Sequence, residues 1–153
     1  MTVRTSAGTT IGITASAPAT FNSAGYDALT FTTIGEVTDL GEFGRQYALV
    51  THNPVGNRGT VKKKGSFNEG TMTLSLGLDT DDAGQILAKS ASTSDADHYF
   101  KVTTQNGDIY YFPALVMSFV VGVGGVDQIT AATIQLEITT ATGGVGIVEK
   151  LAA

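Results

Sequence analysis

Few side chains in this sequence have the type and spacing needed for metal binding. The two histidines, His52 and His98, do not stand at a metal-ligand spacing from each other or from a carboxylate on the same element. We interpret both as strand-edge or surface residues. The run "DTDD" at 79–82 offers the oxygen ligands that Ca²⁺ prefers. It lacks the glycine and the closing glutamate of an EF-hand loop, so helix capping is the preferred interpretation.

Motifs for catalysis or nucleotide binding are missing as well. The glycines at Gly122, Gly124 and Gly125 do not form a dinucleotide fingerprint, and a hairpin turn explains them better. No G-x-S-x-G elbow and no cysteine is present, which excludes a thiol nucleophile, thiolate metal ligands and disulfides. We therefore predict no enzyme activity, no metal and no cofactor.

The one unusual cluster of charge is "NRGTVKKKGSFNEG" at residues 57–70. It contains Arg58, Lys62, Lys63 and Lys64, four of the nine basic residues in a chain of net charge −5. A nucleic acid, an anionic substrate or another copy of the chain could lie opposite these charges. The acidic balance of the whole chain argues against a general nucleic-acid binder.

The composition indicates one mainly β domain over residues 1–153. Charged residues make up 15% of the chain, against a usual ~25%, while Thr and Gly number 23 and 19. Many β-branched polar residues and glycines favour strands joined by turns. A surface with few charges is poorly suited to a free monomer, which suggests that neighbours cover much of it. We find no signal peptide and no apolar run long enough to span a membrane.

Hydrophobic periodicity predicts about eight strands and one helix. The strands are expected at 9–15, 29–43, 45–52, 71–78, 98–119 (a hairpin) and 129–140, and the helix at 79–93, capped by Asp79 or Thr80. Asn106-Gly107 predicts a two-residue hairpin turn that pairs Thr104 with Ile109. These elements favour a β-sandwich or partly closed barrel with one flanking α-helix.

Two segments are expected to lack regular structure. The sequence predicts a long loop over residues 53–70. Loops of this length in compact domains usually serve a function. We expect this loop to become ordered only against a partner. Residues 141–153 read as a flexible, Gly-rich tail that keeps three apolar side chains, Ile147, Val148 and Leu151. We expect these three to dock on a neighbouring copy.

Four motifs, in this order, resemble the tail tube (major tail) proteins of long-tailed phages with non-contractile tails. They are "AGTTIGI", "LTFTTIGEVTDLGEFG", "GTMTLSLGLDTDDAGQIL" and "YFKVTTQNGDIYYFPALVMSF". Together they span about residues 7–140. The resemblance rests on the order of the motifs, since each one alone has low specificity.

The resemblance implies a structural virion protein. Proteins of this family polymerise as stacked hexameric rings into a hollow tube through which the genome is delivered. The implied partners are further copies of the chain, a tape-measure protein, and tail terminator and tail-tip proteins. DNA would pass without specific binding, and no membrane is involved. The implied location is the virion tail, assembled in the bacterial host cytoplasm.

The resemblance implies roles for particular residues. Arg58, Lys62, Lys63 and Lys64, together with Phe67, would contact a neighbouring subunit, with acidic partners among Asp39, Glu42, Asp79, Asp81 and Asp82. The acidic lumen candidates are Asp108, Asp127 and Glu137, because each lies on or beside the polar face of a strand. Two alternatives stay open. One is a type VI secretion-like tube protein, and the other is a β-sandwich module that binds a receptor or carbohydrate.

Overall fold

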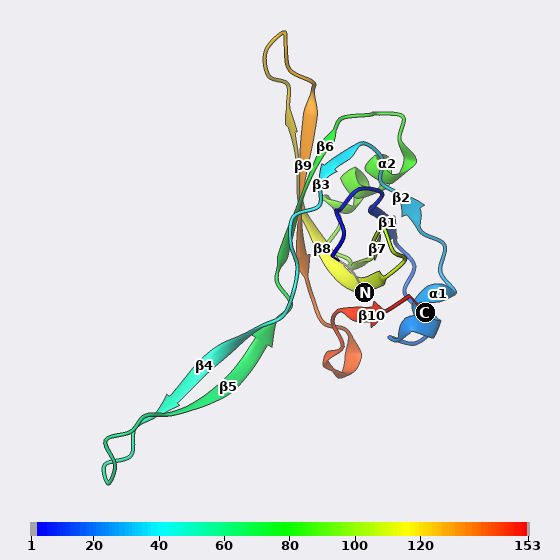
Figure 1. Cartoon of the computed structure of the whole chain (residues 1–153). Helices are drawn as coiled ribbons and strands as arrows, with labels where there is room; N and C mark the ends of the chain where they lie inside the picture. The colour runs from blue at the N-terminus through cyan, green and yellow to red at the C-terminus, as the bar shows by residue number, and fades with distance from the viewer. Residues whose placement is uncertain (1–2, 153) are drawn as a thin grey trace.

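Strands with alternating apolar side chains form a curled antiparallel sheet in the computed structural model, which describes residues 3–152. The order is β2-β1-β7-β8-β9-β6-β3, and β10 pairs with β8. The strands are β1 Thr10–Thr14, β2 Thr32–Thr33, β3 Val37–Asp39, β6 Thr71–Gly77, β7 His98–Thr103, β8 Ile109–Gly122, β9 Ala131–Ile138 and β10 Val148–Lys150. The protein is thus mainly β with a curled half-barrel sheet and few helices, as predicted (Figure 1).

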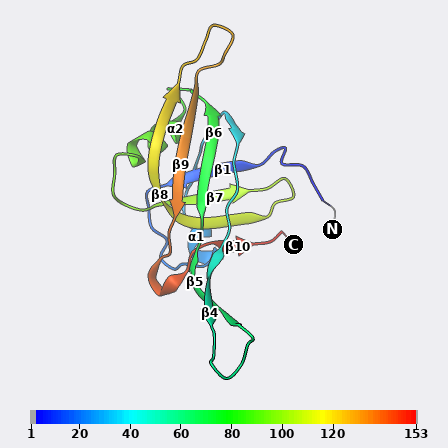
Figure 2. The same cartoon turned by 90° about the vertical axis from the view of Figure 1, so that its left-hand side faces the viewer.

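Strand β8 connects the two halves of this sheet. Its first part, Ile109–Ala114, pairs with β7, and its second part, Ala114–Gly122, pairs with β9. A bulge between Val116 and Ser118 interrupts the second ladder, and bulges of this kind bend a strand and increase its twist. Figure 2 shows the second part of β8, β9 and β6 side by side, with β7 running alongside the first part of β8.

The main hydrophobic core lies inside the curl of the sheet. Alternating residues of β6 and β9 point into it, with Met72, Leu74, Ile134 and Leu136 fully buried. Phe100 of β7 and Phe112 of β8 stack within this core, with ring centroids 5.6 Å apart. Burying side chains of this size removes most of their apolar surface from water and supplies the main driving force for folding.

A second, aromatic core lies on the opposite face of β7 and β8. Tyr26, Tyr99 and Tyr111 form it, and the Tyr26 and Tyr111 rings stack at 5.0 Å. Tyr26 belongs to a short helix, α1 Ser23–Asp27, whose N-cap Asn22 accepts a hydrogen bond from the Gly25 amide at 2.9 Å. Because α1 covers this face, the first part of β8 is buried on both sides. The sequence analysis did not predict α1.

The predicted helix at 79–93 is confirmed, but it starts later than expected. Helix α2 spans Ala83–Ala91, and its N-cap is Asp82 rather than Asp79 or Thr80. One oxygen of the Asp82 carboxylate accepts hydrogen bonds from the amides of Gln85 and Gly35, both at 3.0 Å. The Gly35 amide belongs to the segment between β2 and β3. The tertiary contact therefore selects the capping residue among several acids.

The hairpin between β7 and β8 also differs from the prediction. Thr103, not Thr104, pairs with Ile109, so the connection is longer than a two-residue turn. The Thr104 amide donates to the Asp108 carbonyl at 2.9 Å, which leaves three residues in the loop. Gly107 takes a positive φ of 93°, as the last residue of a three-residue hairpin loop commonly does. The Asn-Gly pair predicted the position of the turn correctly, but not its type.

Residues 29–43 are less regular than the strand predicted there. Only Thr32–Thr33 and Val37–Asp39 pair with the sheet, while Ile34 between them is buried in the main core. Glu36 takes a positive φ of 60° between these short strands. The chain turns here to pass from β1 at one side of the curl to β6 at the other.

The predicted loop at 53–70 is wrong for residues 61–68. Val61–Asn68 forms strand β5, which pairs with β4 Gln46–His52 in a separate two-stranded sheet. Strand β5 escaped the periodicity analysis because both of its faces are exposed, so its side chains show no alternation of apolar and polar residues. The loop proper is limited to residues 53–60.

The predicted flexible tail is also corrected. Residues 142–144 form a 3₁₀ turn, and Val148–Lys150 forms β10 along the edge of β8. Ile147 packs against the main core and Val148 against the aromatic core. The glycines of this segment led us to predict a flexible tail and to miss strand β10. Ile147 and Val148 pack within the chain itself. No helix within residues 3–152 has the length and apolarity to cross a membrane.

The role of Asp82 leads to a stability prediction. Asp82→Ala removes a helix cap and a link to Gly35, so we expect the free energy of unfolding to fall by about 1–2 kcal/mol. Asp81→Ala removes an exposed carboxylate one position earlier, and its effect should stay within about 0.5 kcal/mol. Urea unfolding of both variants measures the difference. Equal losses in the two variants would contradict this assignment of the cap.

Candidate assembly interface

The most exposed part of the structure is the hairpin made by β4, the loop 53–60 and β5. We call these residues, 46–68, the arm. It projects away from the body of the protein (Figure 1), and every residue in it is exposed except Pro54 and Gly65, which are half-buried. An isolated two-stranded hairpin is at best marginally stable in water. Because the arm pairs with no other strand of the described chain, both of its faces and both of its strand edges are available for a partner to cover.

The arm also concentrates positive charge. It holds four of the nine basic residues and none of the fourteen acidic ones, so it carries +4 while the rest of the chain carries −9. Within residues 3–152, the two ion pairs are Arg45–Glu69 and Lys150–Asp27, and neither involves an arm residue. The Lys64 ammonium lies 4.8 Å from the ring centroid of Tyr47. The arm thus presents cations that have no carboxylate partner in the described chain.

Strand register sorts the arm's side chains into two faces. Tyr47 pairs with Phe67, Leu49 with Lys64 and Thr51 with Lys62, which places these six residues on one face. The other face carries the pairs Gln46–Asn68, Val50–Lys63 and His52–Val61. Each face therefore combines apolar side chains with cations. A surface of this kind matches a partner that offers both apolar area and carboxylates.

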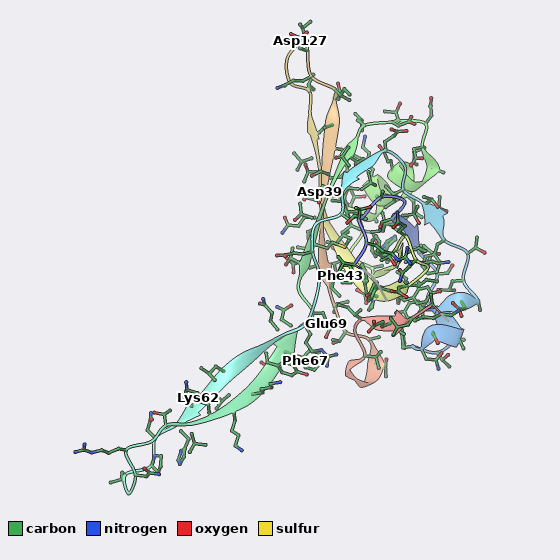
Figure 3. All side chains as sticks on the ribbon, in the orientation of Figure 1. Asp39, Phe43, Lys62, Phe67, Glu69 and Asp127 are labelled. Carbon is green, nitrogen blue, oxygen red and sulfur yellow. The ribbon has the colours of Figure 1, made fainter. Side chains whose placement is uncertain are left out.

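A cluster of contacts anchors the arm at its base. Arg45, directly before β4, lies over the Phe67 ring with its Cζ 3.9 Å from the centroid. Its Nε donates to Glu69 Oε1 at 2.6 Å, and one terminal nitrogen donates to the Tyr47 hydroxyl at 3.3 Å. These two hydrogen bonds, with Tyr47 first and Glu69 second, raise the pKa of Arg45 above its ordinary value. Figure 3 shows Phe67 and Glu69 at this junction.

The five predicted acidic partners lie in three places on the body. Asp79 and Asp81 are exposed in the turn before α2, and the Asp81 amide donates to Asp79 Oδ1 at 3.0 Å. Asp82, in the same turn, is half-buried and already accepts two backbone amides. Glu42 lies near the arm's own base, beside Arg45. Asp79 and Asp81 therefore form an exposed acidic pair that a partner can reach.

Asp39 occupies the third place, on the outward face of the sheet. It pairs with Ser75 of β6, so the two side chains share that face. The neighbouring outward residues come from β6 and β9 and are almost all uncharged: Thr71, Thr73, Ser75, Thr133, Gln135 and Glu137. The Thr71 hydroxyl lies 2.8 Å from both Glu137 carboxylate oxygens. Asp39 and Glu137 thus give this polar face its negative charge.

The structure does not bring the three predicted lumen residues together. Glu137 lies on the outward face just described, whereas Asp127 lies at the tip of the β8–β9 hairpin, far from it (Figure 3). Asp108 lies in the β7–β8 turn, where its carboxylate accepts the Asn106 side-chain amide at 3.0 Å and the Ala152 backbone amide at 2.8 Å. Only Glu137 shares a face with other candidate residues.

Of the docking residues predicted in the tail, two lie in the chain's own cores and one is exposed. Ile147 and Val148 are half-buried in the chain's own cores, so neither needs a neighbour to cover it. Leu151 remains 61% exposed and stays a candidate contact. Phe67 is 36% exposed; the Arg45 guanidinium lies over its ring, and the Tyr47 ring meets it edge to face at the arm base. It therefore stabilises the arm besides offering a surface.

One apolar surface was missed by the sequence analysis. A groove of about 520 Å³ runs between α2 and the second part of β8, lined by Leu78, Ile86, Phe119 and Val121 among others. Ile86 has the helical spacing of a core residue, yet it is 54% exposed and lines this groove. Beyond the groove, the tip of the β8–β9 hairpin exposes Val123, Val126 and Ile129.

The two histidines do not contribute a metal site. His52 is exposed at the end of β4, and His98 is buried at the start of β7 with its Nδ1 3.2 Å from the Ala96 carbonyl. Within residues 3–152, no three side chains of the His, Cys, Asp or Glu type come close enough together to hold an ion.

Comparisons with known proteins support an architecture without assigning a family. No family model and no curated protein matches the sequence. Among solved structures, a chain of the anti-feeding prophage baseplate, reconstructed with six-fold symmetry, aligns with a TM-score of 0.66 and 12% identity, covering 91% of this chain and 93% of that one. A chain from the tail of an empty GTA particle with C6 symmetry aligns at 0.61 and 13%, covering 84% and 90%. The protein therefore has the mainly β fold of these tail and baseplate components, which are structural proteins rather than enzymes.

Proposed function

We propose that this chain is a structural subunit of a phage tail that polymerises as stacked hexameric rings into a hollow tube. The observation that carries the proposal is the arm, an uncovered hairpin of charge +4 on a body of charge −9. A surface that is exposed, apolar and cationic at once suits an acidic partner, and the body of another copy is acidic. The fold is shared with components of two particles that have six-fold symmetry.

The positions of the charges favour head-to-tail contacts along one axis. The arm extends from one end of the body, whereas the turn before α2, with Asp79 and Asp81, lies toward the other end (Figure 1). A contact between unlike surfaces repeats from copy to copy and builds an open polymer instead of stopping at a dimer. Each exposed ion pair stabilises by only about 0–1 kcal/mol. Six copies in a ring would multiply this small contribution.

The outward face of β6 and β9 suits the wall of a channel. Its side chains are hydroxyls and an amide with the carboxylates of Asp39 and Glu137, and none of its named residues is cationic. Such a wall repels phosphates weakly and offers no ammonium or guanidinium group to hold them. We therefore assign this face, with Glu137, to the lumen through which DNA would pass. A tape-measure protein would fill it during assembly, and terminator and tail-tip proteins would close the ends.

The first prediction concerns the arm lysines. Changing Lys62, Lys63 and Lys64 to Glu should abolish tubes or shorten them severely, because the arm would then face an acidic neighbour with like charge. The free energy of unfolding should change by no more than about 0.5 kcal/mol per site, since all three side chains are exposed. Negative-stain microscopy and sedimentation of the purified wild type and variant measure assembly, and chemical unfolding measures stability.

Lysine-to-arginine changes at the same three positions provide the matched control, because they keep the charge and alter only the head group. This variant should assemble like the wild type. Purified wild type that stays monomeric at every concentration would contradict the proposed function. Wild type that retards duplex DNA at moderate salt, with steep salt dependence, would instead favour a nucleic-acid partner.

The second prediction identifies the acidic partner by exchanging charges. Asp79→Lys combined with Asp81→Lys should restore tubes to the variant that carries Glu at 62, 63 and 64. The two new lysines would then attract the three glutamates of the arm, so that the ion pairs between subunits form again with the charges exchanged. The same two changes in the wild-type background should block assembly. Tube length by microscopy is the readout for each variant.

Exchange at Asp39 and Glu42 is the comparison, since both are exposed acids outside the turn before α2. Lysines at these two positions should fail to rescue the arm variant. Rescue by this pair, and not by the pair at 79 and 81, would move the arm's docking site to the edge of β3 and would contradict the head-to-tail arrangement drawn above.

A further inference from the structure

One acidic residue is buried at the base of the arm. Glu69 is 2% exposed and lies between the end of β5 and the start of β6. A buried carboxylate is costly unless hydrogen bonds and a counter-charge satisfy it. Here each oxygen has its own donor: Oε1 accepts from Arg45 Nε at 2.6 Å and Oε2 accepts from the Ile147 amide at 3.0 Å. One side chain therefore joins the arm to the C-terminal segment.

Other hydrogen bonds at the neck of the arm join residues of the neck itself. β4 and β5 form a sheet of their own, and the two chain segments cross at Gly44 and Gly70. The Gly44 amide donates to the Glu69 carbonyl at 3.3 Å, and a Cβ on Gly70 would lie 2.9 Å from the Gly44 carbonyl oxygen. Gly70 has a φ of 102°, which an L side chain rarely adopts. Two close glycines make a narrow neck whose backbone alone restricts bending weakly.

The C-terminal segment is shaped to receive the Glu69 carboxylate. A Cβ on Gly146 would lie 2.5 Å from Glu69 Cδ, so any side chain at this position would have to displace the Glu69 carboxylate. The segment is in turn fixed to the body by the β10–β8 pairing and by Lys150, whose Nζ lies 2.7 Å from Asp27 Oδ2. The hydrogen bonds from Lys150 and from the Tyr111 hydroxyl lower the pKa of Asp27 below its ordinary value. A continuous series of contacts, through Asp27, Lys150, the C-terminal segment and Glu69, thus connects the aromatic core with the base of the arm.

We propose that Glu69 is the positioning residue of the arm, and that it holds the arm in one direction only while residues 146–150 are docked on β8. Arg45 transmits this constraint, because its guanidinium binds Glu69 on one side and covers the Phe67 ring on the other. The C-terminal segment thereby acts on the arm without touching its exposed faces. The relevance for tube assembly rests on the proposed function, but the positioning itself is a property of a single chain.

The absence of cysteine from the sequence allows a direct test with two spin labels. Thr51→Cys places one label on β4 of the arm, and Lys89→Cys places the other on α2, both at exposed positions. Labelled protein is diluted into unlabelled protein, so that pulsed dipolar spectroscopy measures the distance within one chain. We expect a single narrow distribution in the parent protein.

Three variants break the link from different sides. Glu69→Gln replaces one accepting oxygen by a donor, Arg45→Met keeps the stem on Phe67 without its donors, and Gly146→Ala drives a methyl group into the carboxylate. Each should replace the narrow peak by a broad distribution with both longer and shorter distances. Glu137→Gln and Gly122→Ala are the matched controls and should keep the parent distribution. A Cβ on Gly122 meets no atom within 4 Å.

Circular dichroism of each variant shows whether the body remains folded. Arg45 is exposed enough that its substitution leaves the cores intact, so it decides the question even where Glu69→Gln unfolds the chain. A narrow, parent-like distribution in Arg45→Met and Gly146→Ala would overturn the proposal. A narrow distribution in the wild type that broadens in these variants would uphold the positioning role, and if the same wild type forms no tubes, the proposed function alone is rejected.

Discussion

The whole architecture depends on β8 being buried on both faces along its first part. Tyr111 points into the aromatic core and Phe112 into the main core, so a single strand separates and stabilises both. The same strand then passes its bulge and pairs with β9, which bends the sheet into a half-barrel. Helix α1, strand β10 and the C-terminal segment all attach to this first part of β8. The rest of the body is arranged around it.

This arrangement leaves the arm outside both cores. The body buries most of its large apolar residues in the two cores, while Tyr47, Leu49, Val50 and Val61 remain exposed on the two-stranded ribbon of the arm. Natural proteins usually protect exposed strand edges, because such edges invite pairing with other chains. In this chain the exposed ribbon also carries an unpaired charge of +4. Leaving this ribbon exposed costs free energy in a monomer, and a neighbouring copy that covers the ribbon in an assembly would offset that cost. The proposed function rests on this argument.

Sequence reasoning succeeded where a local pattern mirrors burial. Strands β6 and β9 bury one face each, whereas β1 is buried on both faces after Thr10; the alternation of apolar and polar residues in their sequences predicted all three within about two residues. Helix α2 was visible from its acidic start and its 3.6-residue period. The cluster of lysines was visible as a charge anomaly and marked the arm as a candidate interface. Each of these signals is contained in a short stretch of chain.

Local patterns along the chain therefore predicted the mainly β class, the single larger helix, the likeness to tail components and the location of the basic segment. Only the tertiary structure decided that this segment is a paired strand, that Asp82 rather than Asp79 caps α2, and that Ile147 and Val148 are used inside the chain. It also decided that Glu69 is buried between Arg45 and Ile147, which lie 24 and 78 residues away in the sequence. The physical reason is that these outcomes depend on which distant groups meet, whereas periodicity reports only how neighbouring side chains alternate.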